Sequence, residues 1–209
     1  LMWDNAYCLH EVYGQFVPFR DMLTLCREAG NADMVYEFAS TSKITFPGAG
    51  VAVMAASEAN LKYLSGLLGA QTISYDKVNQ LRHVRFLQDK AHVLALMQRH
   101  AAILRPKFEA VLAALRGIAP LGIASWTEPK GGYFISCDAM PGTAKRVLAL
   151  CAEAGVTMTP AGATYPGGND PADSNIRIAP SFPPVEELEQ AMQIFCLALR
   201  MAALEKLGI

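Results

Sequence analysis

A lysine among hydroxyl side chains is the first candidate for chemistry in this sequence. Lys43 ends the segment Ser40-Thr41-Ser42-Lys43, which lies between a predicted strand and the glycine-containing turn of residues 46–50. Burial among apolar neighbours, with no acidic residue close in the sequence, would favour the neutral amine that forms a Schiff base with an aldehyde. The hydroxyls of Ser40 and Ser42, with nearby loop N–H groups, can hold a phosphate. A solvated loop lysine would fit the same segment.

Two further segments place charged groups beside strand-forming residues. Asp4 follows the apolar residues 1–3, so we expect its carboxylate to be buried and to need a cation such as a protonated pyridine nitrogen. Tyr7, three residues later, can donate its hydroxyl to a phenolic oxygen. Arg177 lies among strand formers, and its planar guanidinium suits a carboxylate held by two hydrogen bonds. The alternatives are an aspartate that opens a loop and an arginine in a structural salt bridge.

Composition and charge exclude several classes of protein. The chain has 209 residues, is 52% hydrophobic and carries a formal net charge of −1 without a basic block, so we expect no nucleic-acid partner. No apolar run reaches the roughly 20 residues that a membrane-spanning helix needs, so we expect no membrane partner. The five cysteines are scattered and the four histidines show no ligand spacing, which predicts reduced, buried thiols and no metal. The high apolar content predicts a large core or a buried interface.

The elements that must position these residues follow from apolar periodicity and from capping residues. We expect an α/β arrangement up to about residue 100 and an α+β domain beyond it, with a kink or a break at Pro106 in a long helical segment. The predicted helices cover 19–29, 57–68, 76–115, 143–154 and a C-terminal helix beginning at Pro184, and Ser57 is expected to cap the second of them. One apolar stripe is expected on the long segment at positions 93, 97, 101, 104, 108, 111 and 115, and another on the C-terminal helix at 188, 192, 195, 199 and 202. The predicted strands cover 1–4, 33–38, 51–56, 122–126, 132–137, 156–159 and 176–179.

The three chemical segments together resemble a known family. Their order and approximate spacing are similar to those of pyridoxal-phosphate (PLP)-dependent aminotransferases of fold-type I, class I/II. Within that family, the sequence is similar to a bacterial aspartate aminotransferase subgroup with MocR-like (regulator-like) members. The resemblance covers essentially the whole chain and rests on Asp4-x-x-Tyr7, Ser40-x-Ser42-Lys43, Lys77–Phe86, Pro129-x-Gly131-Gly132-Tyr133-Phe134 and Asn175–Pro183.

The resemblance implies a fold and a division into domains. Residues 1–100 would be the C-terminal part of the large, mixed-sheet PLP-binding domain, and residues 101–209 the small α+β domain. The start Leu1-Met2-Trp3-Asp4 is neither an initiator methionine nor a signal peptide, so we expect the chain to be a piece of something longer. The family's amino-terminal half supplies further groups that hold the cofactor, and these would have to come from outside this chain.

The resemblance also implies a role for each matched residue. Lys43 would bind PLP and move the substrate's proton, and Arg177 would bind the substrate α-carboxylate. Asp4 would pair with the pyridine nitrogen and Tyr7 with the phenolic oxygen of the cofactor. Ser40 and Ser42 would be phosphate ligands. One feature departs from the family. Class I members carry a phosphate-binding arginine about eight residues after the lysine, where this sequence has Gly48-Ala49-Gly50-Val51.

The expected function is transfer of an amino group between an amino acid, with aspartate as the first choice, and a 2-oxo acid, with 2-oxoglutarate as the first choice. An acidic substrate needs a second cation, for which Lys77, Arg82 and Arg85 are candidates by charge. Other PLP reactions, β-elimination or decarboxylation, stay open, as does a PLP-dependent sensor domain of a transcription regulator. The resemblance further implies a homodimer in the cytoplasm.

Overall fold

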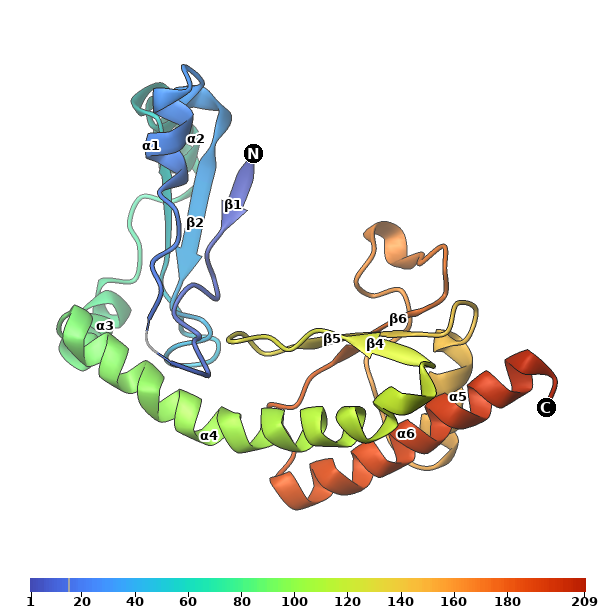
Figure 1. Ribbon diagram of the computed structural model, residues 1–209. Helices are drawn as coiled ribbons and strands as arrows, with labels where there is room; N and C mark the ends of the chain where they lie inside the picture. The colour runs from blue at the N-terminus through green and yellow to red at the C-terminus, as the bar shows by residue number, and fades with distance from the viewer. Residues whose placement is uncertain (15) are drawn as a thin grey trace. The chain divides into compact units, whose positions relative to one another are not determined.

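The computed structural model describes residues 1–14 and 16–209 and divides into two compact units (Figure 1). The first unit comprises Leu1–Glu11 and Gln15–Arg99, and the second comprises Val12–Gly14 and His100–Ile209. The short segment 12–14 belongs to the second unit because its backbone bonds there. The Val12 carbonyl accepts two hydrogen bonds from the Arg105 guanidinium, at 3.0 and 3.1 Å, and the Val12 N–H donates to Lys130 O at 2.9 Å.

A three-stranded mixed sheet lies at the centre of the first unit. Its strands are β1 (Met2–Asp4), β2 (Tyr36–Ser40) and β3 (Ala52–Ala56), in the spatial order β1-β2-β3. Strand β1 runs parallel to β2, with Asp4 opposite Phe38, and β3 pairs with β2 in the antiparallel direction. Aromatic and apolar side chains favour these extended segments. The mixed pairing agrees with the expected part of a mixed-sheet domain.

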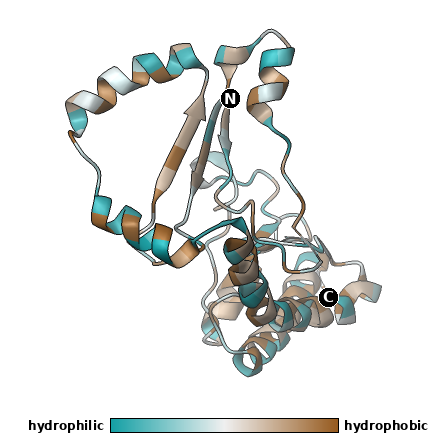
Figure 2. Ribbon diagram, turned by 90° about the vertical axis from the view of Figure 1, so that its left-hand side faces the viewer, coloured by the Kyte–Doolittle hydropathy of each residue, from teal (hydrophilic) through white to brown (hydrophobic). Residues whose placement is uncertain are grey.

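Three helices of the first unit begin at polar caps. They are α1 (Met22–Glu28), α2 (Glu58–Gln71) and α3 (Lys77–Leu87). Asp21, Ser57 and Asp76 each accept the N–H of the residue three positions later, which satisfies a donor that the helix itself leaves without a partner. The predicted cap at Ser57 is therefore confirmed. Figure 2 shows hydrophilic and hydrophobic residues mixed along the helices, and several large apolar side chains of α2 and α3 are exposed.

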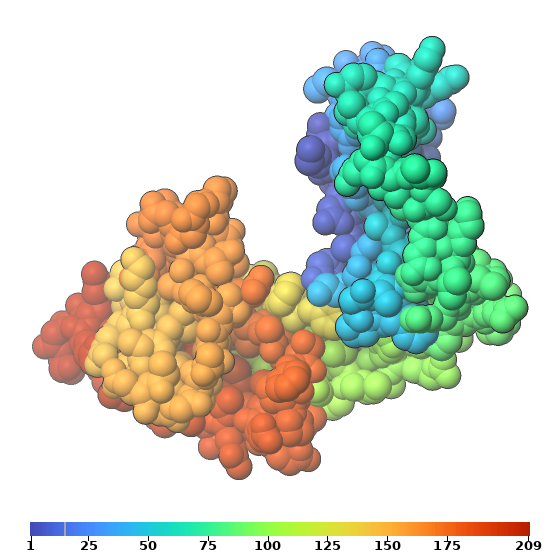
Figure 3. All heavy atoms as spheres, turned by 180° about the vertical axis from the view of Figure 1, so that it is seen from behind, coloured from blue at the N-terminus to red at the C-terminus, as the bar shows by residue number. Residues whose placement is uncertain are grey.

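The second unit packs helices on an antiparallel sheet. Its strands are β4 (Ala124–Trp126), β5 (Ile135–Ala139) and β6 (Asn175–Ile178), in that order, and its helices are α5 (Ala144–Glu153), α6 (Val185–Leu207) and the second half of α4 (Lys90–Ile118). Short 3-10 turns cover Ala32–Met34 in the first unit, and Ala119–Leu121 and Pro166–Gly168 in the second. The loop of residues 160–170 lies at the surface of the second unit (orange in Figure 3).

The core of the second unit follows the apolar periodicity of two helices. The stripe predicted on the C-terminal helix is buried throughout, and the stripe predicted on the long helical segment is buried at every position except 93. Burying a large apolar side chain contributes about 1.5–3 kcal/mol to stability, which makes these two faces its main source. The buried positions of the second unit are Ala101, Leu104, Phe108, Val111 and Leu115 on α4, and Leu188, Met192, Phe195, Leu199 and Ala202 on α6, while the buried Met97 belongs to the first unit.

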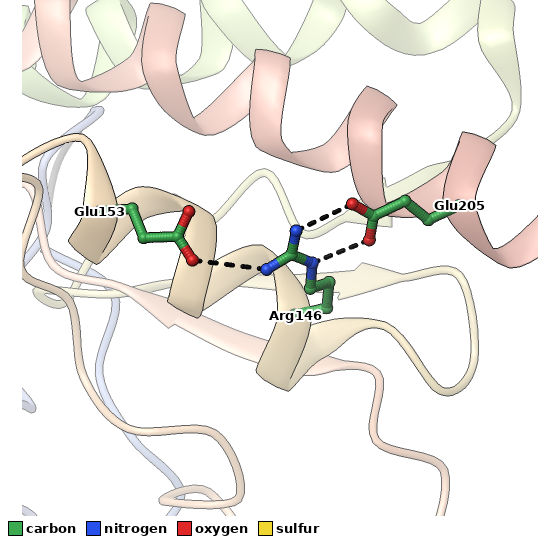
Figure 4. A network of polar contacts seen from close by, with 3 residues as sticks. All are labelled: Arg146, Glu153 and Glu205. Carbon is green, nitrogen blue, oxygen red and sulfur yellow. Dashed lines mark hydrogen bonds and ion pairs between the residues drawn. The ribbon is translucent and has the colours of Figure 1, made fainter.

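A network of charged side chains joins α5 to α6 at the surface (Figure 4). Arg146 donates to both carboxylate oxygens of Glu205 at 2.8 Å and to Glu153 at 3.4 Å. Both glutamates hold the pKa of Arg146 above its ordinary value, through the hydrogen bonds to Glu205 first. Exposed ion pairs of this kind contribute little to stability, so the apolar contacts beneath them hold the two helices together.

One predicted break and one predicted strand are wrong. Of the kink or break expected at Pro106, the break is excluded, because α4 runs through this exposed proline. The break lies at Gln88, whose φ is +56°, and Asp89 then begins α4 by accepting the His92 N–H at 2.9 Å. Residues 156–159, predicted as a strand, pair with no strand among the described residues.

Candidate functional site

The parallel strands of the first unit bring two of the predicted site residues to one edge. Asp4 is the last residue of β1, and Ser40 is the last residue of β2. Because parallel strands end on the same side of a sheet, the turns after Asp4 and after Ser40 lie at the same edge. The carboxyl edge of such strands is where open sheets bind small ligands.

The turn that carries Lys43 is fixed by its own backbone. The N–H groups of Ile44 and Thr45 both donate to Thr41 O at 2.9 Å, and Ile44 anchors the turn because its side chain is buried. Lys43 itself is exposed. The burial that was expected around its side chain is therefore not provided by the described residues.

A histidine that the sequence motifs did not single out connects this turn to the segment after β1. His10 is buried, and its Nε2 lies 3.1 Å from Lys43 O, to which it can only donate. The ring of Tyr7 meets that of His10 edge to face, with 5.4 Å between their centroids. The predicted site residues Tyr7 and Lys43 therefore lie on two turns that are in contact through His10.

The carboxylate of Asp4 is not buried as expected. Strand β1 forms one edge of the sheet, so the end of this strand is open, and Asp4 is exposed. Its Oδ1 accepts the N–H of Ala6 at 2.9 Å, as an aspartate that opens a loop does. Among residues 1–14 and 16–209, no partner of its second oxygen is found.

The predicted phosphate ligands lie beside a glycine. Ser40 is half-buried at the end of β2, and Ser42 is exposed in the turn, where the backbone of Gly50 lies directly against it. Thr41 and Val51 join the two sides of the loop through paired hydrogen bonds of 2.9 Å. Residues 48–51 thus place small side chains and backbone where the family carries an arginine. The donor set of hydroxyls and amides is chemically suited to a phosphate.

Helix α3 covers the other side of the lysine loop. Asn79 donates its side-chain N–H to Ala49 O at 2.9 Å, and the buried His83 contacts threonine hydroxyls of the turn. The guanidinium of Arg82 lies 5.0 Å from the centre of the Phe46 ring. Of the three cations proposed for an acidic substrate, Arg82 is therefore beside the loop, while Lys77 and Arg85 are exposed on the same helix.

The predicted carboxylate ligand Arg177 belongs to the second unit. It lies on β6 opposite Ser136, and its guanidinium is 4.5 Å from the centre of the Phe134 ring and 3.4 Å from Thr159 Oγ1. Its Nε is buried without a hydrogen-bond partner among residues 1–14 and 16–209, and no carboxylate of these residues forms an ion pair with it. A structural salt bridge, the alternative interpretation, is therefore absent from the described part of the chain.

A cavity of about 180 Å³ adjoins Arg177. Its wall is mostly apolar and includes the extended residues 156–159 together with Met192 and Phe195 of α6. The strand that carries Arg177 begins at a second polar cluster, where Asn175 donates to Ser136 and Asp138 at 2.9 and 2.8 Å. The guanidinium is thus held between an aromatic ring and an apolar wall, with donors left for an anion.

The predicted residues therefore form two groups. One group lies at the edge of the sheet in the first unit, and the other is a single arginine in the second unit. The first group consists of Asp4, Tyr7, Ser40, Ser42 and Lys43, and the second of Arg177. The histidines His10 and His83 were not singled out, although His83 lies in the matched run 77–86, because each contacts a residue more than 30 positions away in the sequence.

The structure also bears on metals, membranes and thiols. Across the residues that the structure describes, no group of three or more His, Cys, Asp or Glu side chains is arranged to hold a metal ion. None of the helices in this part of the chain has the length and apolar content needed to cross a membrane.

Cys137, Cys151 and Cys196 are buried, and burial raises the pKa of Cys137 to about 12, whereas Cys8 and Cys26 are only half-buried.

Comparison with known proteins connects these residues to one family. The profile of the family described as aspartate amino-transferase matches residues 1–208. A curated aspartate aminotransferase of Corynebacterium glutamicum is 47% identical over 206 residues, which are 98% of this chain and 48% of that protein. The chain thus spans about half the length of the curated relatives it matches.

Solved structures show the same fold. The crystal structure of an aspartate transaminase from Corynebacterium glutamicum superposes with a TM-score of 0.96 at 47% identity, covering 98% of this chain and 49% of that one. An α-aminoadipate aminotransferase from Thermus thermophilus superposes with a TM-score of 0.77 at 24% identity, covering 97% and 50%. The expected fold, half of a fold-type I aminotransferase, is confirmed by these superpositions.

Proposed function

Because the chain belongs to the aspartate amino-transferase family, we propose that it is part of a PLP-dependent aminotransferase in which Lys43 binds the cofactor. The observation that carries the proposal is the position of Lys43 in a fixed turn at the carboxyl edge of parallel strands, in contact through His10 with the turn of Tyr7. The proposed division places the cofactor residues in a large domain over 1–100 and Arg177 in a small domain over 101–209.

The residues at this edge fit the chemistry of PLP. When bound, PLP supplies an aldehyde that accepts the amino group and a ring that withdraws electrons. The free oxygen of the Asp4 carboxylate would pair with the ring nitrogen, and the Tyr7 hydroxyl would donate to the phenolic oxygen. Ser40 and Ser42 would hold the phosphate together with backbone N–H groups, and the bare backbone of Gly50 packs directly against Ser42 in this loop.

Lys43 has two tasks in this proposal. Its amine would hold the cofactor, and as a free base it would take the proton from the substrate α-carbon and deliver it to C4′ of the cofactor. A base for this transfer must be held within reach of the proton it moves. The backbone hydrogen bonds of the turn, to Thr41 O and from His10 to Lys43 O, restrict where the side chain can begin.

Arg177 would bind the substrate α-carboxylate. Its donors and its place beside an apolar wall suit a carboxylate that is partly removed from water. We propose aspartate as the amino donor, in line with the relative's description as an aspartate aminotransferase, and 2-oxoglutarate as the acceptor. Arg82, beside the Lys43 loop, is the favoured cation for the second carboxylate of an acidic substrate.

A homodimer is part of the same proposal. Several large apolar side chains of α2, of α3 and of the segment between them are well exposed, among them Tyr63 (70%), Ile73 (102%) and Val78 (79%). Exposed apolar side chains gathered on neighbouring elements are typical of surfaces that bind another protein part. A second subunit of the complete protein would cover such a surface. The mass of the complete protein in solution tests whether it is a dimer.

One experiment tests the assignment of Lys43. The complete protein is mixed with PLP, its visible absorbance is recorded before and after aspartate, and borohydride reduction followed by peptide mass mapping locates the attached cofactor. The expected result is an absorbance band that collapses with aspartate and returns with 2-oxoglutarate, and a label on Lys43. Lys43→Ala should lose the label, whereas Lys62→Ala, at an exposed lysine of α2, should keep it.

The outcomes separate the competing functions. A label at another lysine would contradict the assignment, and a band that ignores every amino acid would contradict the aminotransferase. Analysis of the products formed from aspartate distinguishes amino transfer from β-elimination and decarboxylation, because only amino transfer gives the 2-oxo acid with the four-carbon chain intact and leaves the cofactor aminated.

A further inference from the structure

The buried histidine of helix α3 contacts both ends of the turn that carries Lys43. His83 is only 5% exposed, although its neighbours Arg82 and Val84 on the helix are exposed. Its Nε2 lies 3.1 Å from Thr41 Oγ1 and 2.8 Å from Thr45 Oγ1. These threonines stand two residues before and two residues after Lys43. A single ring nitrogen therefore connects the start and the end of the turn to a helix distant in the sequence.

The hydrogen-bond partners assign the roles of the two ring nitrogens. Nδ1 lies 2.9 Å from Asn79 O, and a carbonyl can only accept, so Nδ1 carries the hydrogen. With the hydrogen on Nδ1, Nε2 accepts from the threonine hydroxyls. Thr41 Oγ1 accepts the Val51 N–H at 2.9 Å, which leaves its own hydrogen for Nε2. Thr45 Oγ1, 2.8 Å from Nε2, can donate its hydrogen to Nε2 or to Thr41 O at 3.1 Å.

Other contacts of α3 act on the same loop. Asn79 donates to Ala49 O, and the ring of Phe46 meets the ring of His83 edge to face at 5.6 Å. The loop is thus fastened at 41, 45, 46 and 49, and the exposed Lys43 lies between the first two of these positions. A side chain that must meet a reacting atom needs such a fixed backbone, since a misplacement of about 1 Å can cost about 100-fold in rate.

We infer that His83 is a positioning residue: through Thr41 and Thr45 it holds the turn from which Lys43 reaches the cofactor. The inference rests on the proposed function for the reaction itself, but the fastening of the turn is a property of this chain alone. His83 acts through the hydrogen-bond acceptor at Nε2, so a side chain that restores this acceptor should hold the turn in the same position.

Two substitutions separate the acceptor from the bulk of the ring. His83→Phe fills the space of the ring without any hydrogen bond. His83→Gln reaches about as far as Nε2 and offers an amide oxygen to the threonine hydroxyls. The same pair of changes at His92, a histidine of the first unit that is 55% exposed, serves as the control.

The first readout is amide hydrogen exchange of the complete protein without cofactor. The N–H groups of Ile44, Thr45 and Val51 bond within this network, so in His83→Phe their exchange should become about 10-fold faster or more. His83→Gln should return most of the protection, and both His92 variants should match the wild type. Unchanged exchange in His83→Phe, or equal loss in the Phe and Gln variants, would overturn the inference.

The second readout is steady-state kinetics with PLP. His83→Phe should lower kcat by roughly 10- to 100-fold, with KM for aspartate changed by less than about 3-fold, because the carboxylate contact is assigned to Arg177. His83→Gln should recover most of kcat, and a loss confined to KM would contradict positioning of Lys43. If the wild type forms no adduct at Lys43, the proposed function fails, while the exchange result still decides whether His83 holds the turn.

Discussion

Gly50 lies so close to Ser42 that no side chain fits between them. A Cβ atom on Gly50 would stand 2.8 Å from Ser42 Oγ and 3.2 Å from both the Cα and the N of Ser42. Contacts under 3.0 Å are not tolerated by real Cβ atoms, and the two contacts at 3.2 Å involve backbone, which cannot rotate away. Ser42 immediately precedes Lys43, so the bare backbone of Gly50 determines where the lysine turn lies.

Gly50→Ala should therefore displace the turn without unfolding the protein. We expect kcat/KM of the complete enzyme to fall by roughly 10- to 100-fold, since a small shift of Lys43 and Ser42 alters both proton transfer and phosphate binding. Steady-state kinetics and the affinity for PLP measure the effect. The control is Gly66→Ala in α2, where nothing lies within 4 Å of the added Cβ. That change should leave activity intact and stabilise the helix by up to about 1 kcal/mol.

The carboxylate role of Arg177 predicts a change in KM. Arg177→Lys keeps the charge but loses the planar pair of donors, so KM for aspartate should rise by roughly 10- to 100-fold, the equivalent of one lost charge-assisted hydrogen bond. The absorbance of the bound cofactor should stay as in the wild type, because Arg177 lies in the other unit from Lys43. An unchanged KM would assign Arg177 to structure rather than to substrate.

The sequence predicted the elements that depend on local or periodic signals. The apolar stripes of α4 and α6 and the cap at Ser57 were readable because spacing of three or four residues and a short polar side chain directly reflect helix geometry. The segment 40–43 was placed in a loop after a predicted strand, whereas Ser40 is the last residue of β2. Fold class and the order of most elements thus follow from residue types and their spacing.

The failures have a common physical origin in contacts that are distant in sequence. The strand predicted at 156–159 needs a pairing partner, which local composition does not reveal. Pro106 was a candidate for a kink or a break, but the break between the two helices lies at Gln88, whose φ of +56° precedes the cap at Asp89. His83 lies in the matched run 77–86, but its contact with Thr45 spans 38 positions, so the run did not indicate its role.

A buried carboxylate before β6 should make the second unit sensitive to acid. Asp170 accepts the backbone N–H groups of Asn175 and Ser174, each at 2.8 Å, and of Ala172 at 2.9 Å. These bonds hold the pKa of Asp170 below its ordinary value of 3.8. The ionised form is thus favoured in the folded state, and its stabilising effect is present above pH 3.8 and lost as the pH falls through the lowered pKa.

Asp170→Asn should therefore destabilise the protein at neutral pH and lose part of this dependence on acid. The difference in unfolding free energy between wild type and variant should be constant from about pH 7 to about pH 5 and shrink below that range. Urea unfolding at a series of pH values measures it. Other acidic residues with lowered pKa values are present in both proteins, so their contributions to the pH dependence cancel in this difference. Glu189→Gln, at an exposed carboxylate of α6, is the control and should show no such trend.

The packing of α6 gives the largest expected change in stability. Phe195 is 1% exposed in the core of the second unit and also borders the cavity beside Arg177. Phe195→Ala would extend that cavity, and we expect a loss of about 3–5 kcal/mol in the free energy of unfolding. Leu197→Ala, at a position 55% exposed on the same helix, should change stability by no more than about 0.5 kcal/mol. Urea titrations followed by circular dichroism compare the two, and a similar small loss for both would show that the buried stripe of α6 is not the core that stabilises this unit.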